Sequence, residues 1–173
     1  MNLLESFKKI RAFAFDVDGV LTDGSLLVLD DGQMARRMNI KDGYALQLAV
    51  KSGYPVLVIS GGTSQAVKLR LQKLGISDIY MGVKDKKEVL VRFVKAMNLN
   101  WDEVLYMGDD VPDLEVMSMC GLPCCPSDAA SEIRSASHFI SQIPGGSGCV
   151  REVIEKVMRL QKKWTHNFSI QSK

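Results

Sequence analysis

The chain has 173 residues, of which 46% are hydrophobic and 24% are charged, and its formal net charge is +2. These values predict one globular domain with a well-buried core, and they give no electrostatic case for a nucleic-acid partner. No stretch approaches the roughly 20 apolar residues of a transmembrane helix, and residues 1–11 are too charged for a signal peptide. We therefore expect a cytoplasmic protein with no nucleic-acid or membrane partner.

The cysteines lack the paired spacing of a zinc site. They are Cys120, Cys124, Cys125 and Cys149, and two of them are adjacent within an apolar segment. This arrangement predicts buried, reduced thiols, which suit the cytoplasm.

The first predicted strand, residues 10–15, ends in a pair of aspartates, Asp16 and Asp18, which a glycine follows. An apolar run of this kind predicts a buried strand, so the pair is expected at the strand's carboxyl end. Two carboxylates at this spacing repel each other and lose hydration, which fits a bound divalent cation or acid–base chemistry better than a contribution to stability. A metal site is our first interpretation.

Residues 25–39 predict a β-hairpin, with two strands around a turn at 30–32. Many of its side chains are apolar, so a hairpin that stands alone would expose apolar surface. We expect it to protrude from the rest of the chain and to pack against another subunit.

From residue 42 onward, predicted strands and helices alternate. The strands are apolar runs at 55–59, 79–81, 104–107, 122–125 and 138–140, and the helices lie at 42–52, 64–74, 85–97, up to 120, 128–136 and up to about 162. This alternation predicts an α/β fold, a Rossmann-like open parallel sheet with helices on both faces, in a single domain of residues 1–162. The polar tail, 163–173, is expected to be disordered or docked on a neighbour.

Several polar side chains follow strands of the predicted sheet. The carboxyl ends of parallel strands share one edge, so loops remote in sequence converge there and bring together Asp16, Asp18, Ser60, Lys86, Asp109, Asp110 and Asp113. Carboxylates from different strand ends suit a Mg²⁺ ion that keeps some of its waters. A hydroxyl, glycine amides and a lysine suit a phosphoryl group. Together they predict phosphoryl transfer, in which one carboxylate attacks phosphorus and a second moves the proton.

The motifs resemble those of a known family. Residues 16–24, D-V-D-G-V-L-T-D-G, resemble the first motif of the haloacid dehalogenase superfamily of phosphatases; Ser60 and Lys86 resemble its second and third, and residues 108–113 its fourth. Residues 39–44, 70–76 and 145–152 extend the resemblance to the capless branch that contains the 3-deoxy-D-manno-octulosonate 8-phosphate phosphatases. The hairpin would then stand in place of a cap domain.

This resemblance implies a Mg²⁺-dependent phosphatase of lipopolysaccharide biosynthesis that works through an aspartyl phosphate. It implies that Asp16 is the nucleophile and Asp18 the general acid and base. The metal ligands would be the side chains of Asp16 and Asp109 and the backbone carbonyl of Asp18.

The remaining site residues follow from the same resemblance. Ser60, Gly61 and Lys86 would hold the phosphoryl group. Asp110 and Asp113 would orient water and the lysine. The carboxylate of a sugar acid requires a cation, for which the candidates are Arg70, Lys41 and Lys73. The resemblance also implies a homotetramer in which a neighbour's hairpin, and sometimes its tail, completes the active site.

Two alternatives stay open at this stage. The first is another substrate, 2-keto-3-deoxynononate 9-phosphate or a related nine-carbon phosphate. Gly62 departs from both groups of relatives, because many octulosonate phosphatases carry an arginine there and relatives acting on the nine-carbon acid look acidic; it leans against the nine-carbon acid. The second is a phospho-accepting receiver or binding module. In a receiver, however, an acidic pair closes the first strand and the acceptor aspartate follows a later one, whereas here Asp18 comes two residues after the candidate acceptor.

Overall fold

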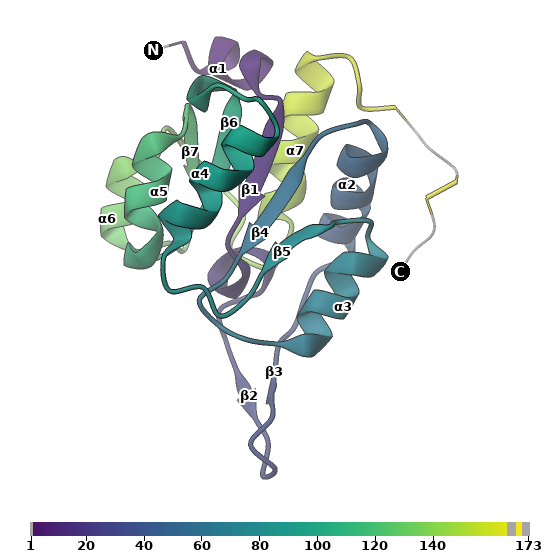
Figure 1. Ribbon diagram of the computed structural model, residues 1–173, viewed down its shortest axis with the longest axis vertical. Helices are drawn as coiled ribbons and strands as arrows, with labels where there is room; N and C mark the ends of the chain where they lie inside the picture. The colour runs from purple at the N-terminus through teal and green to yellow at the C-terminus, as the bar shows by residue number, and fades with distance from the viewer. Residues whose placement is uncertain (1, 166–168, 171–173) are drawn as a thin grey trace.

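A six-stranded parallel sheet forms the centre of the protein. The computed structural model describes residues 2–165 and 169–170, and the strands lie in the order β5-β4-β1-β6-β7-β8 (Figure 1). They are β1 (Ala12–Phe15), β4 (Val56–Ile59), β5 (Asp78–Tyr80), β6 (Val104–Met107), β7 (Leu122–Cys125) and β8 (Phe139–Ile140). The predicted Rossmann-like α/β fold is confirmed.

Helices cover both faces of the sheet, and β1 shows why. Its side chains alternate between faces, so Phe13 and Phe15 pack with α1 (Leu3–Lys9), α2 (Ile40–Lys51), α3 (Gln65–Lys73) and α7 (Cys149–Leu160). Ala12 and Ala14 face α4 (Lys86–Ala96), α5 (Leu114–Met119) and α6 (Ser131–Ala136), which lie on the opposite side (Figure 1). Each face has its own apolar core.

Polar caps set the start of several helices. The side chains of Asn39, Ser64 and Asp85 each accept a backbone N–H in the first turn of α2, α3 and α4, which satisfies a donor that the helix itself leaves unpaired. The helix predicted over 128–136 begins only at Ser131. Asp128 instead accepts a hydrogen bond from the Gly145 N–H at 2.9 Å, and so belongs to a loop contact.

The hairpin protrudes from the layered core, as predicted (Figure 1). Its strands, β2 (Leu27–Val28) and β3 (Met34–Ala35), are shorter than the sequence predicts. They form a separate two-stranded sheet, and an isolated two-stranded ladder is only marginally stable. Leu27 and Val28 remain 65% and 64% exposed, and Met34 51%. This chain by itself therefore leaves the apolar surface of the hairpin uncovered.

The described part of the tail packs on its own chain, which differs from the predicted disorder or docking on a neighbour. The Trp164 ring meets Tyr44 of α2 edge-on at 6.2 Å between centroids, and the guanidinium groups of Arg151 and Arg159 lie 5.4 and 5.9 Å from its centre. Aromatic and cation–π contacts of this kind hold the indole against the helices. Residues 166–168 and 171–173, which the prediction also covered, lie outside the described residues.

The cysteines are free and buried, as predicted. Among the described residues, no helix has the length and apolar character needed to cross a membrane.

Candidate active site

A cavity of about 310 Å³ opens at the carboxyl ends of β1, β4 and β6. Its lining contains most of the predicted site residues: Asp16, Asp18, Ser60, Gly61, Lys86, Asp109, Asp110 and Asp113, together with Gly24, Gly62 and Pro112. These residues come from loops far apart in the sequence. The parallel sheet brings them to one edge, as the order of the strands predicts.

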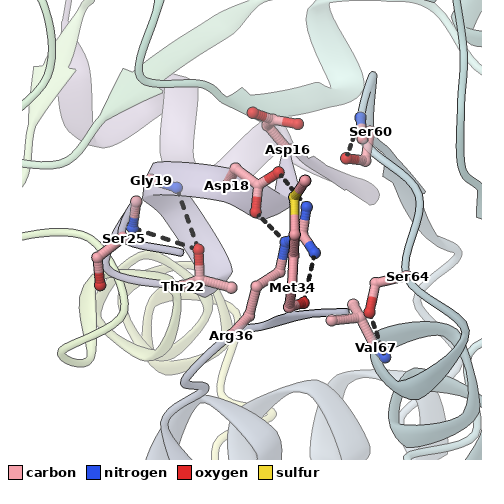
Figure 2. Close-up of polar contacts among 12 residues, drawn as sticks. Asp16, Asp18, Gly19, Thr22, Ser25, Met34, Arg36, Ser60, Ser64 and Val67 are labelled. Atoms are coloured by element: carbon pink, nitrogen blue, oxygen red, sulfur yellow. Dashed lines mark hydrogen bonds and ion pairs between the residues drawn. The ribbon is translucent and has the colours of Figure 1, made fainter. Parts of the chain in front are cut away.

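The backbone after β1 positions the aspartate pair. The Asp16 N–H donates to the carbonyl of Met107 at 3.1 Å, which ties the end of β1 to the end of β6. Gly19 then adopts a φ of +83°, a conformation that favours glycine. The hydroxyl of Thr22 accepts from the backbone N–H of Gly19 at 3.3 Å (Figure 2) and from that of Gly24, also at 3.3 Å. This turn fixes Asp16 and Asp18 on the cavity wall.

A late glycine loop braces the same turn from behind. Gly145 and Gly146 lie so close to the backbone of Gly19 and Thr22 that a Cβ at either glycine would overlap it. The Gly146 N–H donates to the Val20 carbonyl at 2.9 Å. The end of the chain therefore supports the turn near its beginning.

Asp42 holds the helix that follows this loop. Its Oδ1 accepts the Arg151 N–H at 2.7 Å, near the start of α7. Burial raises the pKa of Asp42 to about 6, although hydrogen bonds from the Arg151 and Gly148 amides oppose that rise. Asp42 thus ties α2 to the first turn of α7.

A buried lysine links two of the carboxylates. The Lys86 ammonium lies 3.1 Å from Asp16 Oδ1 and 2.7 Å from Asp113 Oδ1. The Tyr106 hydroxyl donates to the same Asp113 oxygen at 2.7 Å, and the Asp109 N–H donates to Asp113 Oδ2 at 3.3 Å. Asp113 is fully engaged by these donors, so it orients the lysine toward Asp16.

The buried charges are unbalanced. Burial, followed by the neighbouring Asp113, raises the pKa of Asp16 to about 6, against the opposing effect of Lys86. Burial, followed by Asp16 and Asp113, raises the pKa of Asp109 to about 7. Burial lowers the pKa of Lys86, but Asp16 and Asp113 more than offset this and raise it. The site therefore holds more negative charge than its lysine neutralises.

This excess fits a divalent cation. Oxygens of Asp16, Asp109 and Asp113 lie within 4.8 Å of one another, and carboxylate oxygens suit Mg²⁺. Because Asp113 already accepts from Lys86 and Tyr106, the geometry favours Asp16 and Asp109 as ligands. The backbone carbonyl of Asp18 as a further ligand stays a prediction.

The loop after β4 supplies neutral donors. Ser60 is 1% exposed, and its hydroxyl oxygen accepts the Gly62 N–H at 3.1 Å, which leaves the hydroxyl proton for an acceptor in the cavity. Ser60, Gly61 and Gly62 line the same cavity as the carboxylates. This arrangement suits a bound phosphoryl group.

Arg36, which contacts Asp18, is not among the residues predicted from the sequence. The Arg36 Nε donates to Asp18 Oδ1 at 2.6 Å and Nη2 donates to Oδ2 at 3.2 Å (Figure 2). The period of two in a strand provides a signal, because it places residue 36 on the same side as Met34 and Met38, apart from Arg37. The hydrogen bond from Tyr106 to Asp113 was also missed; within β6, Tyr106 reads from sequence only as core.

The predicted sugar-acid cations are not brought together. Arg70 lines a groove of about 820 Å³ between the hairpin and α3, next to the active-site cavity. Lys41 and Lys73 are exposed and line neither that groove nor the cavity. A role for these lysines stays a prediction.

Comparison with known proteins identifies the family. A model of the haloacid dehalogenase-like hydrolases matches residues 72–150. A curated relative, the 3-deoxy-D-manno-octulosonate 8-phosphate phosphatase of Yersinia pestis, is 30% identical over 162 residues, which cover 94% of this chain and 87% of the relative. The chain belongs to the haloacid dehalogenase-like hydrolases.

Solved structures within this family are also similar. The crystal structure of the Yersinia pestis phosphatase aligns with a TM-score of 0.90 and 30% identity, covering 93% of this chain and 87% of that one. Another similar structure is the phosphatase of the same name from Moraxella catarrhalis, in complex with a magnesium ion, a phosphate ion and a KDO molecule. It aligns with a TM-score of 0.89 and 34% identity, covering 93% of this chain and 92% of that one.

The raised pKa of Asp109 predicts how metal-free protein responds to pH. The folded state binds this proton more tightly than the unfolded chain, so the wild type loses stability as pH rises from about 4 through about 7. We expect metal-free Asp109→Asn protein to be more stable than wild type at pH 8, and the difference to shrink toward pH 4. Urea denaturation with a chelator present measures the free energy of unfolding of both proteins at each pH.

Added Mg²⁺ should make the wild type more stable than Asp109→Asn at pH 8, because it stabilises the wild type and acts much less on the variant. The exposed Asp102→Asn serves as the control. A lower stability of metal-free Asp109→Asn at pH 8 would contradict the electrostatic account.

Proposed function

We propose that this protein is a Mg²⁺-dependent phosphatase that hydrolyses 3-deoxy-D-manno-octulosonate 8-phosphate to the free sugar acid and phosphate through an aspartyl phosphate. The observation that carries the proposal is the convergence of Asp16, Asp18, Lys86 and Asp109 on one cavity. The Moraxella catarrhalis relative, whose complex contains magnesium, phosphate and KDO, supports both the cofactor and the substrate class.

The first step assigns Asp16 as the nucleophile. Its carboxylate attacks phosphorus, while Lys86, 3.1 Å from Asp16 Oδ1, and the Ser60 hydroxyl offset the charge on the phosphoryl oxygens. Asp16 and Asp109 would hold Mg²⁺, which when bound supplies further positive charge against these oxygens. Asp113 and Tyr106 keep the lysine in place, and Asp110 at the rim is assigned to orienting water.

Asp18 supplies the proton transfers. It gives a proton to the leaving sugar oxygen as the bond to phosphorus breaks. It then takes a proton from the water that attacks the aspartyl phosphate, which releases phosphate and restores Asp16. Its place on the same braced turn as Asp16 keeps the two carboxylates in a fixed relation.

We also propose a pathway and a cell compartment for this reaction. We assign it to lipopolysaccharide biosynthesis, as the family resemblance implies, and to the cytoplasm, in keeping with the free thiols. Cations near the groove, Arg70 first among them, would meet the sugar-acid carboxylate. We also propose a homotetramer, because the exposed apolar hairpin needs a partner surface.

Replacement of the nucleophile tests the reaction. Asp16→Ala should lower phosphate release by roughly 10³-fold or more, because no other group can form the covalent intermediate. The assay is phosphate release from a panel of eight- and nine-carbon keto-acid phosphates, with neutral sugar phosphates as comparison and the surface variant Glu132→Ala as control. Full hydrolysis by Asp16→Ala would contradict the assignment of Asp16 as the nucleophile. A wild type that is phosphorylated without turnover would indicate a receiver.

Replacement of the proton donor separates acid–base chemistry from metal binding. Asp18→Asn should slow turnover by roughly 10²- to 10⁴-fold, because the leaving oxygen receives no proton. Calorimetric titration should show Mg²⁺ binding unchanged, since a backbone carbonyl ligand survives the substitution. Loss of Mg²⁺ binding with an intact circular dichroism spectrum would contradict this assignment.

The assembly can be tested at the hairpin. Light scattering should give the mass of a tetramer for the wild type and a smaller species for Leu27→Asp, because a charge would be buried at the interface. Leu4→Asp, which changes an equally exposed leucine of α1, is the control. A wild-type monomer at working concentration would remove the shared active site from the proposal.

A further inference from the structure

We infer that Arg36 makes the release of Asp18 depend on an anionic group in the substrate's leaving group. In the free enzyme its guanidinium holds both oxygens of Asp18. When the substrate binds, the leaving group's carboxylate takes over the guanidinium, and the released Asp18 takes up a proton from water and passes it to the leaving oxygen. This inference rests on the proposed function, since it assigns Asp18 as the acid.

The contact between the two residues is a two-point ion pair. Nε and Nη2 of Arg36 donate to different oxygens of Asp18, at 2.6 and 3.2 Å. Figure 2 shows the carboxylate of Asp18 directed toward this guanidinium. A planar fork of this type matches a carboxylate in geometry as well as in charge. A carboxylate held in this way is not free to protonate a leaving group.

The two partners differ in their exposure to solvent. The Arg36 side chain is 5% exposed, whereas that of Asp18 is 36% exposed. A buried guanidinium that loses its partner is costly. Among the described residues, the remaining hydrogen bond of this guanidinium runs from Nη1 to the Met34 carbonyl at 3.3 Å. Asp18 can therefore leave only if another anion takes its place. A second carboxylate is the chemically equivalent replacement.

Arg36 lies where such an anion would arrive. It lines the groove between the hairpin and α3, while its partner Asp18 lines the cavity that holds Asp16 and Lys86. A Cβ at Gly62 would lie 2.9 Å from Asp18 Oδ2 and 3.0 Å from Arg36 Nη2, so the missing side chain of this residue leaves room for the pair. A phosphate on the cavity floor places the rest of the substrate beside Arg36.

The test compares two substrates in each variant. One is the eight-carbon keto sugar acid phosphate, and the other is a phosphate ester of a neutral sugar that lacks the carboxylate. In Arg36→Ala, the preference for the acid, as a ratio of kcat/KM values, should fall by about 10- to 100-fold, mainly through a higher KM. Arg36→Lys keeps the charge but loses the two-point contact. Its preference for the acid should lie between that of Arg36→Ala and that of the wild type.

Arg37→Ala is the matched control. Arg37 is the next residue, its side chain is 85% exposed, and it pairs with Asp23; this variant should keep the wild-type preference. Because both substrates are assayed in one preparation, the ratio does not depend on the fraction of protein that folds. The inference is overturned if Arg36→Ala keeps the wild-type ratio, or if both substrates lose activity equally. A wild type that hydrolyses no phosphate ester would overturn the proposed function as well.

Discussion

The excess of buried negative charge at the carboxyl ends of β1 and β6 is the constraint on which the rest of the site depends. The hydrogen bond from the Asp16 N–H to the Met107 carbonyl holds Asp16 close to Asp109. Lys86 is the one cation among the described residues that line the cavity, and it offsets both of them and Asp113. Burial makes that arrangement unfavourable in the free protein. The same oxygens suit a divalent cation, so a cluster of charges that is unfavourable in the free protein is suited to bind a metal.

The sequence predicts this part of the molecule well, because topology alone determines it. Once the apolar runs at residues 12–15 and 104–107 are identified as parallel strands, Asp16 and Asp109 must follow neighbouring carboxyl ends. Ser60 and Lys86 are placed by the same rule, and each sits beside a helix whose start is marked by a capping residue. No knowledge of side-chain packing is needed for these positions.

The sequence did not predict contacts that depend on how separate elements pack. Tyr106 reads as an ordinary core residue, and its bond to Asp113 appears only when β6 and the loop after it are seen together. The period of two sets Arg36 and Arg37 on opposite sides of the hairpin, but which of them faces Asp18 depends on how the hairpin is oriented. The docking of Trp164 on Tyr44 likewise joins segments about 120 residues apart in sequence, for which local pattern carries no signal.

The brace formed by Gly145 and Gly146 has a consequence for the order in which the protein is made. These glycines pack against the backbone of Gly19 and Thr22, so the turn that carries Asp16 and Asp18 is supported by residues synthesised more than 120 positions later. Contacts this distant in sequence form late in folding. A chain still emerging from the ribosome thus carries both aspartates before it has the support that fixes them, and the site matures only after Gly145 and Gly146 have been synthesised.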